Sequence, residues 1–491
     1  MKLSSYGWMG LKKSKRMLLI GLTSLYMLAS LTGCGWLSSG KKDLPPPVVP
    51  STEQPVERYT GEPSEQISYV YTTMRELSLT FNGLAERDEL VPLLDALDRY
   101  KVKATFFVPG IRAAEEPDLV QEIAARGHQI ESNALDGTDL TELKYNQIYH
   151  QLRLTNEILE RETTVKPKYI RTRSGSFNDD VRLAAAHLGM EAVITYSINL
   201  QSWNGEAASK VEDYVMTNIT RGGIIALNTE NNPDLLKSLD MVIASVQKIG
   251  YSLVPLSRLL EYKHERKPLE QIEGYDAAKI NPDYGNAEYE VIYKADRNDK
   301  QIALTFDDWG TDYTVTRLLD LLKEENIKAS FFLRGNGPER NPNLARAIAE
   351  DGHDVANHTY SHPVITNLTP EEIQEEVVKA HQVITEAIQQ KPVMMFRPPT
   401  GAFDEETAKI VAATGYRTIA MYDVTTLDWD RSNDADHIVK TILENTESGS
   451  VILLHILDGL HTLEALPTAI QKLRDQGYTF VKMSELIDHQ S

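Results

Sequence analysis

Short apolar runs alternate with amphipathic stretches through most of this chain. In its C-terminal half the apolar runs are rich in β-branched and aromatic side chains, which favour strands, and the stretches between them have helical periodicity. This pattern predicts strands at 301–306, 329–333, 354–356, 394–397, 418–422, 451–455 and 479–481, with helices at 314–325, 343–351, 370–389 and 404–414. Strict alternation of strand and helix predicts parallel strands joined by crossover helices. Six or seven such strands suggest an incomplete barrel.

The same pattern occurs twice. Leu79-Thr80-Phe81 matches Leu304-Thr305-Phe306, and Gly127-His128 matches Gly352-His353, at a constant offset of 225 residues. The offset then increases by one residue, so that Arg171 matches Arg397 and Trp203 matches Trp429. A register held over so many positions predicts two copies of one domain, at 67–262 and 289–491, joined by a polar linker at 263–288.

The N-terminus has the features of an export signal. Lys12, Lys13, Lys15 and Arg16 precede an apolar run from residue 17 to residue 31. The run ends in Leu31-Thr32-Gly33-Cys34, which resembles the bacterial lipobox and implies a lipidated Cys34 after removal of the signal, 1–34. An uncleaved membrane span is the alternative, although the run is at the short limit for crossing a bilayer. A Pro- and Ser-containing segment, 35–66, would be a disordered tether. We therefore expect a lipid-anchored protein on the outer face of a bacterial membrane.

The composition limits which kinds of binding partner and which covalent cross-links this chain can have. A net charge of −20 disfavours nucleic acid. Cys34 is the single cysteine, so no intrachain disulfide is possible. With 41% hydrophobic residues the chain can build proper cores, and we expect a monomer.

Polar residues collect after the predicted strands of the second copy. Asp307 and Asp308 end the first strand, and His358 and His362 follow the third. A spacing of four would place both imidazoles on one side of a helical turn, where they suit a single metal ion. Two histidines and one carboxylate leave metal positions open for water and substrate, as hydrolytic sites require.

The first copy is an internal control for this hypothesis. It keeps the scaffold residues, but at the positions of Asp307, Asp308, His358, His362 and His455 it has Asn82, Gly83, Asn133, Gly137 and Asn228. Residues needed only for folding would be needed in both copies. The pattern therefore predicts an active second copy and a degenerate first copy.

These residues make the chain similar to the polysaccharide deacetylase family, also known as the NodB homology domain or carbohydrate esterase family four. The resemblance covers about residues 291–488 and, more loosely, 67–262. Thr305-Phe306-Asp307-Asp308 resembles the first motif of the family, His358 with His362 the second, and Arg397-Pro398-Pro399-Thr400-Gly401 the third. Asp428-Trp429 resembles the fourth motif and 451–455 the fifth.

The resemblance implies a role for each residue. Asp308, His358 and His362 would bind one divalent cation, most compatible with Zn²⁺ although Co²⁺ or Mn²⁺ would also fit. Asp307 would be the general base, oriented by Arg397, and His455 the general acid, held by Asp428. Thr400 would offer its backbone N–H to the oxyanion, and Trp429 and Leu453 would line the substrate site.

The resemblance also implies a fold and an activity. The fold would be two tandem deformed (β/α) barrels. The activity would be removal of N-acetyl groups from an extracellular or cell-wall polysaccharide, such as peptidoglycan or a chitin-like chain. A non-catalytic glycan-binding scaffold and an O-acetyl esterase of the acetylxylan type are the alternatives. Four departures from the motifs, Trp309-Gly310, Thr400, Thr425 and Ile456-Leu457-Asp458, bear on substrate choice more than on catalysis.

A few residues are expected to be structural. His128 and His353 occupy one position in both copies, which indicates a role in folding. Arg171 lacks the aspartate that Arg397 has, so we expect a relic or a surface ion pair.

Overall fold

The computed structural model describes residues 56–200, 207–263 and 266–488. Cys34, the predicted signal, most of the predicted tether and Trp203 lie outside these ranges. None of the helices within the ranges is long and apolar enough to span a membrane.

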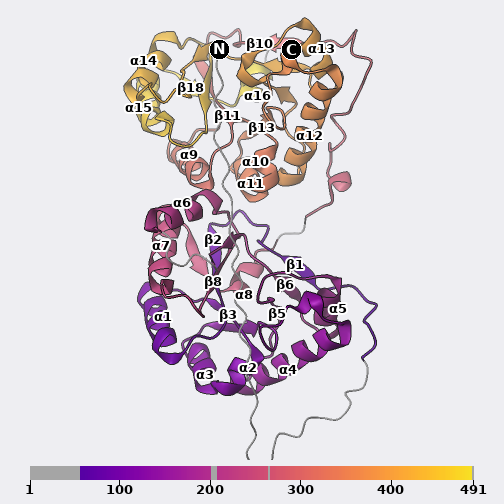
Figure 1. The fold of residues 1–491 in the computed structure, drawn as a ribbon. Coiled ribbons are helices and arrows are strands. Elements are labelled where there is room, and N and C mark those ends of the chain that lie inside the picture. The colour runs from indigo at the N-terminus through magenta and orange to yellow at the C-terminus, as the bar shows by residue number, and fades with distance from the viewer. Residues whose placement is uncertain (1–55, 201–206, 264–265, 489–491) are drawn as a thin grey trace, which may run out of the picture. The chain divides into compact units, whose positions relative to one another are not determined.

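Two sheets are present, one in each copy (Figure 1). The strands of the first copy are β1 Glu65–Ile67, β2 Glu76–Asn82, β3 Thr105–Val108, β4 Gln129–Ser132, β5 Tyr169–Ile170, β6 Ala192–Ile194, β7 Ile198–Asn199, β8 Ile224–Asn228 and β9 Ser252–Val254. Those of the second copy are β10 Glu290–Ile292, β11 Gln301–Asp308, β12 Ser330–Leu333, β13 Asp354–Asn357, β14 Met395–Phe396, β15 Thr418–Ala420, β16 Val424–Thr425, β17 Val451–His455 and β18 Thr479–Phe480.

Helices follow most strands. In the first copy they are α1 Arg87–Tyr100, α2 Gly110–Glu115, α3 Pro117–Ala125, α4 Tyr145–Thr163, α5 Asp179–His187, α6 Ala208–Asn218, α7 Leu235–Lys248 and α8 Leu256–Leu260. In the second copy they are α9 Asp312–Glu324, α10 Asn336–Arg340, α11 Pro342–Glu350, α12 Pro370–Ile388, α13 Glu405–Ala413, α14 Ala435–Asn445, α15 Thr462–Asp475 and α16 Met483–Ile487.

The two sheets have the same topology. The strand order is β1-β6-β5-β4-β3-β2-β8-β7 in the first and β10-β15-β14-β13-β12-β11-β17-β16 in the second, with β9 and β18 each pairing with the central strand, β2 or β11. The paired strands are parallel throughout, for example β11 with β12 and with β17. The predicted fold, two tandem deformed (β/α) barrels, is confirmed. The strands β10 and β16 were not predicted.

The central strand β11 shows how the site is positioned. Ile302, Leu304 and Phe306 pack into the apolar layer formed with the surrounding helices, whereas Ala303 lies in the separate cluster of the barrel interior. Successive side chains of a strand point to opposite faces, so Asp307 lies on the same face as Ala303. The central strand therefore places Asp307 at the end of the barrel interior.

Parts of the predicted tether and of the predicted linker pack against the folded copies. Tyr59 lies against an apolar cluster of the first copy, and Arg58 pairs with Asp180 at 2.7 Å. In the linker, Ala278 is buried in a cluster of the second copy, and Gly274 O accepts a hydrogen bond from His381 Nε2 at 2.8 Å.

Candidate active site

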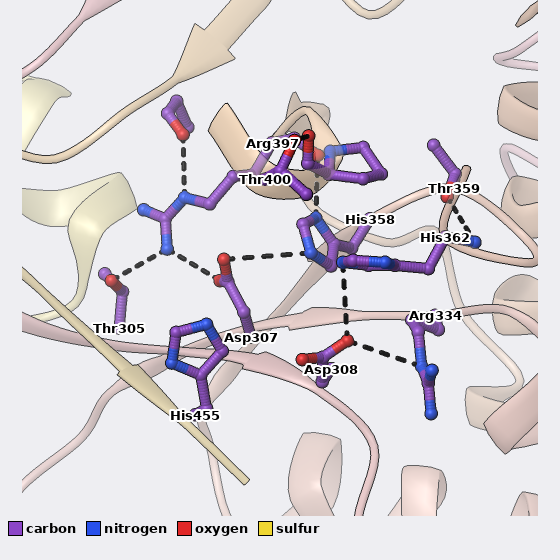
Figure 2. A network of polar contacts seen from close by, with 12 residues as sticks. Thr305, Asp307, Asp308, Arg334, His358, Thr359, His362, Arg397, Thr400 and His455 are labelled. Carbon is purple, nitrogen blue, oxygen red and sulfur yellow. Dashed lines mark hydrogen bonds and ion pairs between the residues drawn. The ribbon is translucent and has the colours of Figure 1, made fainter. Parts of the chain in front are cut away.

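The candidate catalytic residues lie at one edge of the second sheet. Because the strands are parallel, their carboxyl ends meet there. The predicted residues lie in the last residues of β11 and β17 and in the loops that follow β13, β14 and β16. Asp307 and His455 are direct neighbours in the register of β11 and β17. The edge thus collects side chains that are far apart in the sequence (Figure 2).

Asp308, His358 and His362 form a possible metal site. One donor atom from each lies within 4.8 Å of the others. His362 Nε2 lies 3.6 Å from Asp308 Oδ1 (Figure 2). His358 uses Nδ1 in a 2.8 Å hydrogen bond to the carbonyl oxygen of Arg397, an arrangement in which Nδ1 carries the proton and Nε2 has a free lone pair.

Burial supports the neutral imidazole that a metal requires. It lowers the pKa of His358 to about 3, so this ring is uncharged at neutral pH. Two neutral imidazoles and a carboxylate are the donor set of many hydrolytic zinc sites. These three residues therefore fit a divalent cation.

The two histidines lie on a loop and not on the helical turn predicted from their spacing. Thr359 and His362 have left-handed backbone conformations, with φ of 62° and 67°. The Thr359 hydroxyl accepts a hydrogen bond from His362 N at 3.0 Å, and Thr359 N donates to Asn357 Oδ1 at 2.9 Å. This hydrogen-bonded loop, not α-helical periodicity, brings the imidazoles together.

Asp307 is buried beside Arg397. Arg397 Nη1 donates to Asp307 Oδ1 at 2.7 Å and to Thr305 Oγ1 at 2.9 Å. The guanidinium lies 3.9 Å from the centre of the Phe332 ring and donates to backbone carbonyls through Nε and Nη2. Burial raises the pKa of Asp307, whereas the positive charge of Arg397 acts to lower it. The arginine thus fixes one carboxylate oxygen and leaves Oδ2 facing His358.

His455 is held by Asp428. His455 Nδ1 lies 2.7 Å from Asp428 Oδ1, and Asp428 Oδ2 accepts hydrogen bonds from His455 N and from the Thr462 hydroxyl. Burial lowers the pKa of His455, but the hydrogen bond and negative charge of Asp428, together with the charges of Asp307 and Asp308, raise the pKa above its ordinary value. Such a histidine can keep a proton on Nε2 near neutral pH.

The remaining predicted residues differ in exposure. Trp429 is 52% exposed beside the site, and Leu453 is buried in β17. Thr400 is exposed, with φ of 60° in the turn after β14. A surface tryptophan next to catalytic groups is suited to stacking on a sugar ring.

Three contacts of the site were not predicted. Arg334, directly after β12, lies 3.4 Å from Asp308 Oδ1 through Nε, and a charged residue at a strand end could have signalled it. Thr305 is bonded to Arg397, and its counterpart Thr80 in the first copy was a visible signal. Thr462, at the start of α15, had no signal in the sequence.

Arg171 in the first copy is neither a relic nor part of a surface ion pair. It is fully buried and donates to Thr80 Oγ1 at 2.6 Å and to Asn82 Oδ1 at 3.3 Å. Its Nε and Nη2 donate to the carbonyl oxygens of Ile194 and Thr195. Asn82 thus replaces the aspartate with a neutral acceptor, and the arginine keeps its place in the fold.

Known proteins are similar to this chain in sequence. The polysaccharide deacetylase family matches residues 70–193 and 294–419, together just over half of the chain. The chain therefore belongs to the polysaccharide deacetylase family, as its motifs predicted, and the family matches each copy once.

Individual relatives are about one third identical. An uncharacterized protein YlxY of Bacillus subtilis is 33% identical over 216 residues, which is 44% of this chain and 66% of that protein. A peptidoglycan-N-acetylglucosamine deacetylase of Bacillus cereus is 33% identical over 220 residues, which is 44% of this chain and 78% of the enzyme. The peptidoglycan-N-acetylmuramic acid deacetylase PdaA of Bacillus subtilis is 30% identical over 40% of this chain and 76% of its own length.

Solved structures show the same degree of similarity. The Bc1960 peptidoglycan N-acetylglucosamine deacetylase is 33% identical over 40% of this chain and 93% of that chain, with a TM-score of 0.39. BA3943 of Bacillus anthracis, described as a pseudoenzyme of the same esterase family, is 34% identical over 40% of this chain and 69% of that chain, with a TM-score of 0.38.

Proposed function

We propose that the second copy hydrolyses N-acetyl groups on a cell-wall glycan and releases acetate. The observation that supports this most strongly is the convergence of Asp308, His358 and His362 beside the Asp307–Arg397 pair. Relatives named as peptidoglycan deacetylases favour peptidoglycan as the substrate, ahead of a chitin-like polymer.

The chain's own residues supply the proton transfers. Amide hydrolysis requires a base for the attacking water and a proton for the departing nitrogen. Asp307 would accept the proton of the water through Oδ2, since Oδ1 is engaged by Arg397. His455, on the neighbouring strand, would donate from Nε2 to the nitrogen, since Nδ1 is engaged by Asp428. Two groups with opposite roles therefore stand next to one another at one sheet edge.

The negative charge of the reaction also needs partners. The backbone N–H of Thr400 would donate to the developing oxyanion from the turn after β14. A divalent cation bound by Asp308, His358 and His362, for which we propose Zn²⁺, would polarise the acetyl carbonyl and acidify water. Trp429 and Leu453 would line the sugar-binding side of the groove.

We also propose where this chemistry takes place. The basic segment, apolar run and Leu31-Thr32-Gly33-Cys34 at the N-terminus support export and lipidation at Cys34. The enzyme would then act as a monomer tethered to the outer face of the cell membrane, where it meets the wall polymer.

Acetate release from a glycan panel tests the activity. We expect release from peptidoglycan or from N-acetylglucosamine oligomers, and little from acetylxylan. A chelator or Asp308→Ala should reduce release at least about 100-fold, because the cation is lost. The control Asp436→Ala changes an exposed acid of α14 and should leave release unchanged. Undiminished release after chelation would reject the metal site, and release from acetylxylan alone would indicate an O-acetyl esterase.

A further inference from the structure

The first copy retains a cleft where the second has its candidate active site. A cavity of about 680 Å³ lies at the carboxyl edge of the first sheet. Its walls come from the loops that follow the strands, including Leu84 after β2, Pro109 after β3, Gly137 after β4, Arg173 after β5 and Glu230 after β8. A volume of this size accommodates two or three sugar rings.

The cleft is not built for a metal. Arg173 pairs with Glu230 at 3.3 Å, and both side chains occupy the space of the missing ligands. A Cβ atom added at Gly83, the counterpart of Asp308, would lie 2.9 Å from Glu230 Cδ. One added at Gly137, the counterpart of His362, would lie 3.0 Å from Arg173 Nη1.

The third ligand position is also changed. Asn133, the counterpart of His358, donates through Nδ2 to the carbonyl oxygen of Arg171 at 2.7 Å. His358 makes the equivalent contact to Arg397 O through Nδ1. Asparagine thus keeps the hydrogen bond that shapes the cleft but has no imidazole nitrogen to bind a cation.

The charges of the lining indicate the ligand. Five acids and two arginines line the cavity. Arg173 pairs with Glu230, and Arg112 pairs with Glu86 at 2.8 Å. Asp88, Glu89 and Asp136 line the same cavity and form no ion pair within the described residues. A cleft with this excess of carboxylates attracts cations and repels anions.

We propose that the first copy binds the product of the second, a de-N-acetylated glycan. Removal of an acetyl group converts a neutral amide into a primary ammonium, which is the change that an acidic, sugar-sized cleft can recognise. Acids alone would not define such a site, but here they line a cavity of sugar-binding size at the sheet edge that corresponds to the candidate active site of the second copy. The inference rests on the proposed deacetylase activity.

Titration of the full-length chain tests the proposal. Calorimetry at pH 6, with a chelator present so that the second copy does not hydrolyse the ligand, compares a glucosamine tetramer with an N-acetylglucosamine tetramer. The variant Asp88→Asn/Glu89→Gln should weaken binding of the glucosamine tetramer on the order of tenfold and leave the N-acetylated tetramer unaffected, because only the former carries ammonium groups. The matched control Glu157→Gln/Glu160→Gln removes two charges from α4, away from the cavity, and should change neither affinity.

Three results would overturn the proposal: equal affinity of the pocket variant and the unmodified chain, tighter binding of the N-acetylated tetramer to the first copy, or complete displacement of the glucosamine tetramer by equimolar spermidine. Acetate release from the same preparations keeps the two hypotheses apart. If acetate is released and the pocket variant has no effect on binding, only the product site is rejected. If the binding pattern holds without acetate release, the proposed activity is rejected and an amino-sugar site remains.

Discussion

His455 shows how one neighbouring side chain sets the chemistry of another. Burial alone would lower the pKa of this histidine, and Asp428, with smaller contributions from Asp307 and Asp308, raises it instead. A general acid works in its protonated form, so activity should fall as pH rises through the raised pKa. In Asp428→Asn the negative charge is gone, and the alkaline limb of the kcat profile should move to lower pH while kcat falls about 10- to 100-fold.

A matched variant separates this effect from loss of structure. Asp423→Asn removes another carboxylate, one that accepts hydrogen bonds from the Ser450 hydroxyl and Val451 N and forms no hydrogen bond or ion pair with a histidine in the described part of the chain. It should leave the alkaline limb in place. An unchanged profile in Asp428→Asn would show that His455 does not act as the acid.

Sequence predicted the residues of the site better than their contacts. Asp307, Asp308 and Arg397 stand at strand ends. The two aspartates are replaced in the first copy and the arginine is kept there, so all three could be recognised from the sequence. Thr462 was not, because its hydrogen bond to Asp428 depends on how α15 packs. The burial of Arg171 was missed for a related reason, since its acceptors are two backbone carbonyls and two uncharged side chains, none of them a carboxylate.

At the level of elements, the end of β11 has an unusual backbone. Asp308 has φ of 81°, and its counterpart Gly83 has φ of 88°. This region is open to glycine and costs other residues on the order of 1 kcal/mol. The second copy thus places a candidate metal ligand on a backbone suited to glycine, and we expect this placement to cost some stability.

The variant Asp308→Gly tests this point. It should increase the free energy of unfolding by about 1 kcal/mol, measured by chemical denaturation without metal, and abolish zinc binding. As a control, Asn326→Gly relieves another left-handed residue, in the turn after α9, and should stabilise the chain without affecting zinc. A less stable Asp308→Gly chain would show that the backbone at this position is not strained.

The elements themselves were largely predictable. The strands with four or more residues in the second copy were all located, because their runs are mostly buried and contain aromatic or β-branched residues. The strands β10 and β16 have three and two residues and were missed, although β14, β15 and β18 are as short and were predicted. β10 directly follows the segment assigned to the linker, and β16 lies just after the predicted strand at 418–422. The loop that carries His358 and His362 was misread because a spacing of four is shared by a helical turn and by a loop with two left-handed residues.

At the scale of the whole molecule, the two copies have sheets of the same topology but different side chains at the carboxyl edge of the sheet. Grafting the ligands Gly83→Asp, Asn133→His and Gly137→His into a chain silenced by Asp308→Ala should create no zinc site, because Arg173 and Glu230 occupy the space. Adding Arg173→Ala and Glu230→Ala should allow about one zinc ion per chain, measured by calorimetry. Zinc binding by the first graft alone would contradict this account of the degenerate cleft.

The buried arginine common to both copies has a consequence for the first copy. Arg171 and Arg397 each join three strands through carbonyl and hydroxyl oxygens, and the carboxylate of Asp307 is only one acceptor among several. The position of the buried arginine in the barrel therefore does not depend on the carboxylate of Asp307. In the first copy the buried arginine keeps its hydrogen bonds with Asn82 in place of the acid, so the domain keeps its fold without that group and is free to bind a different ligand.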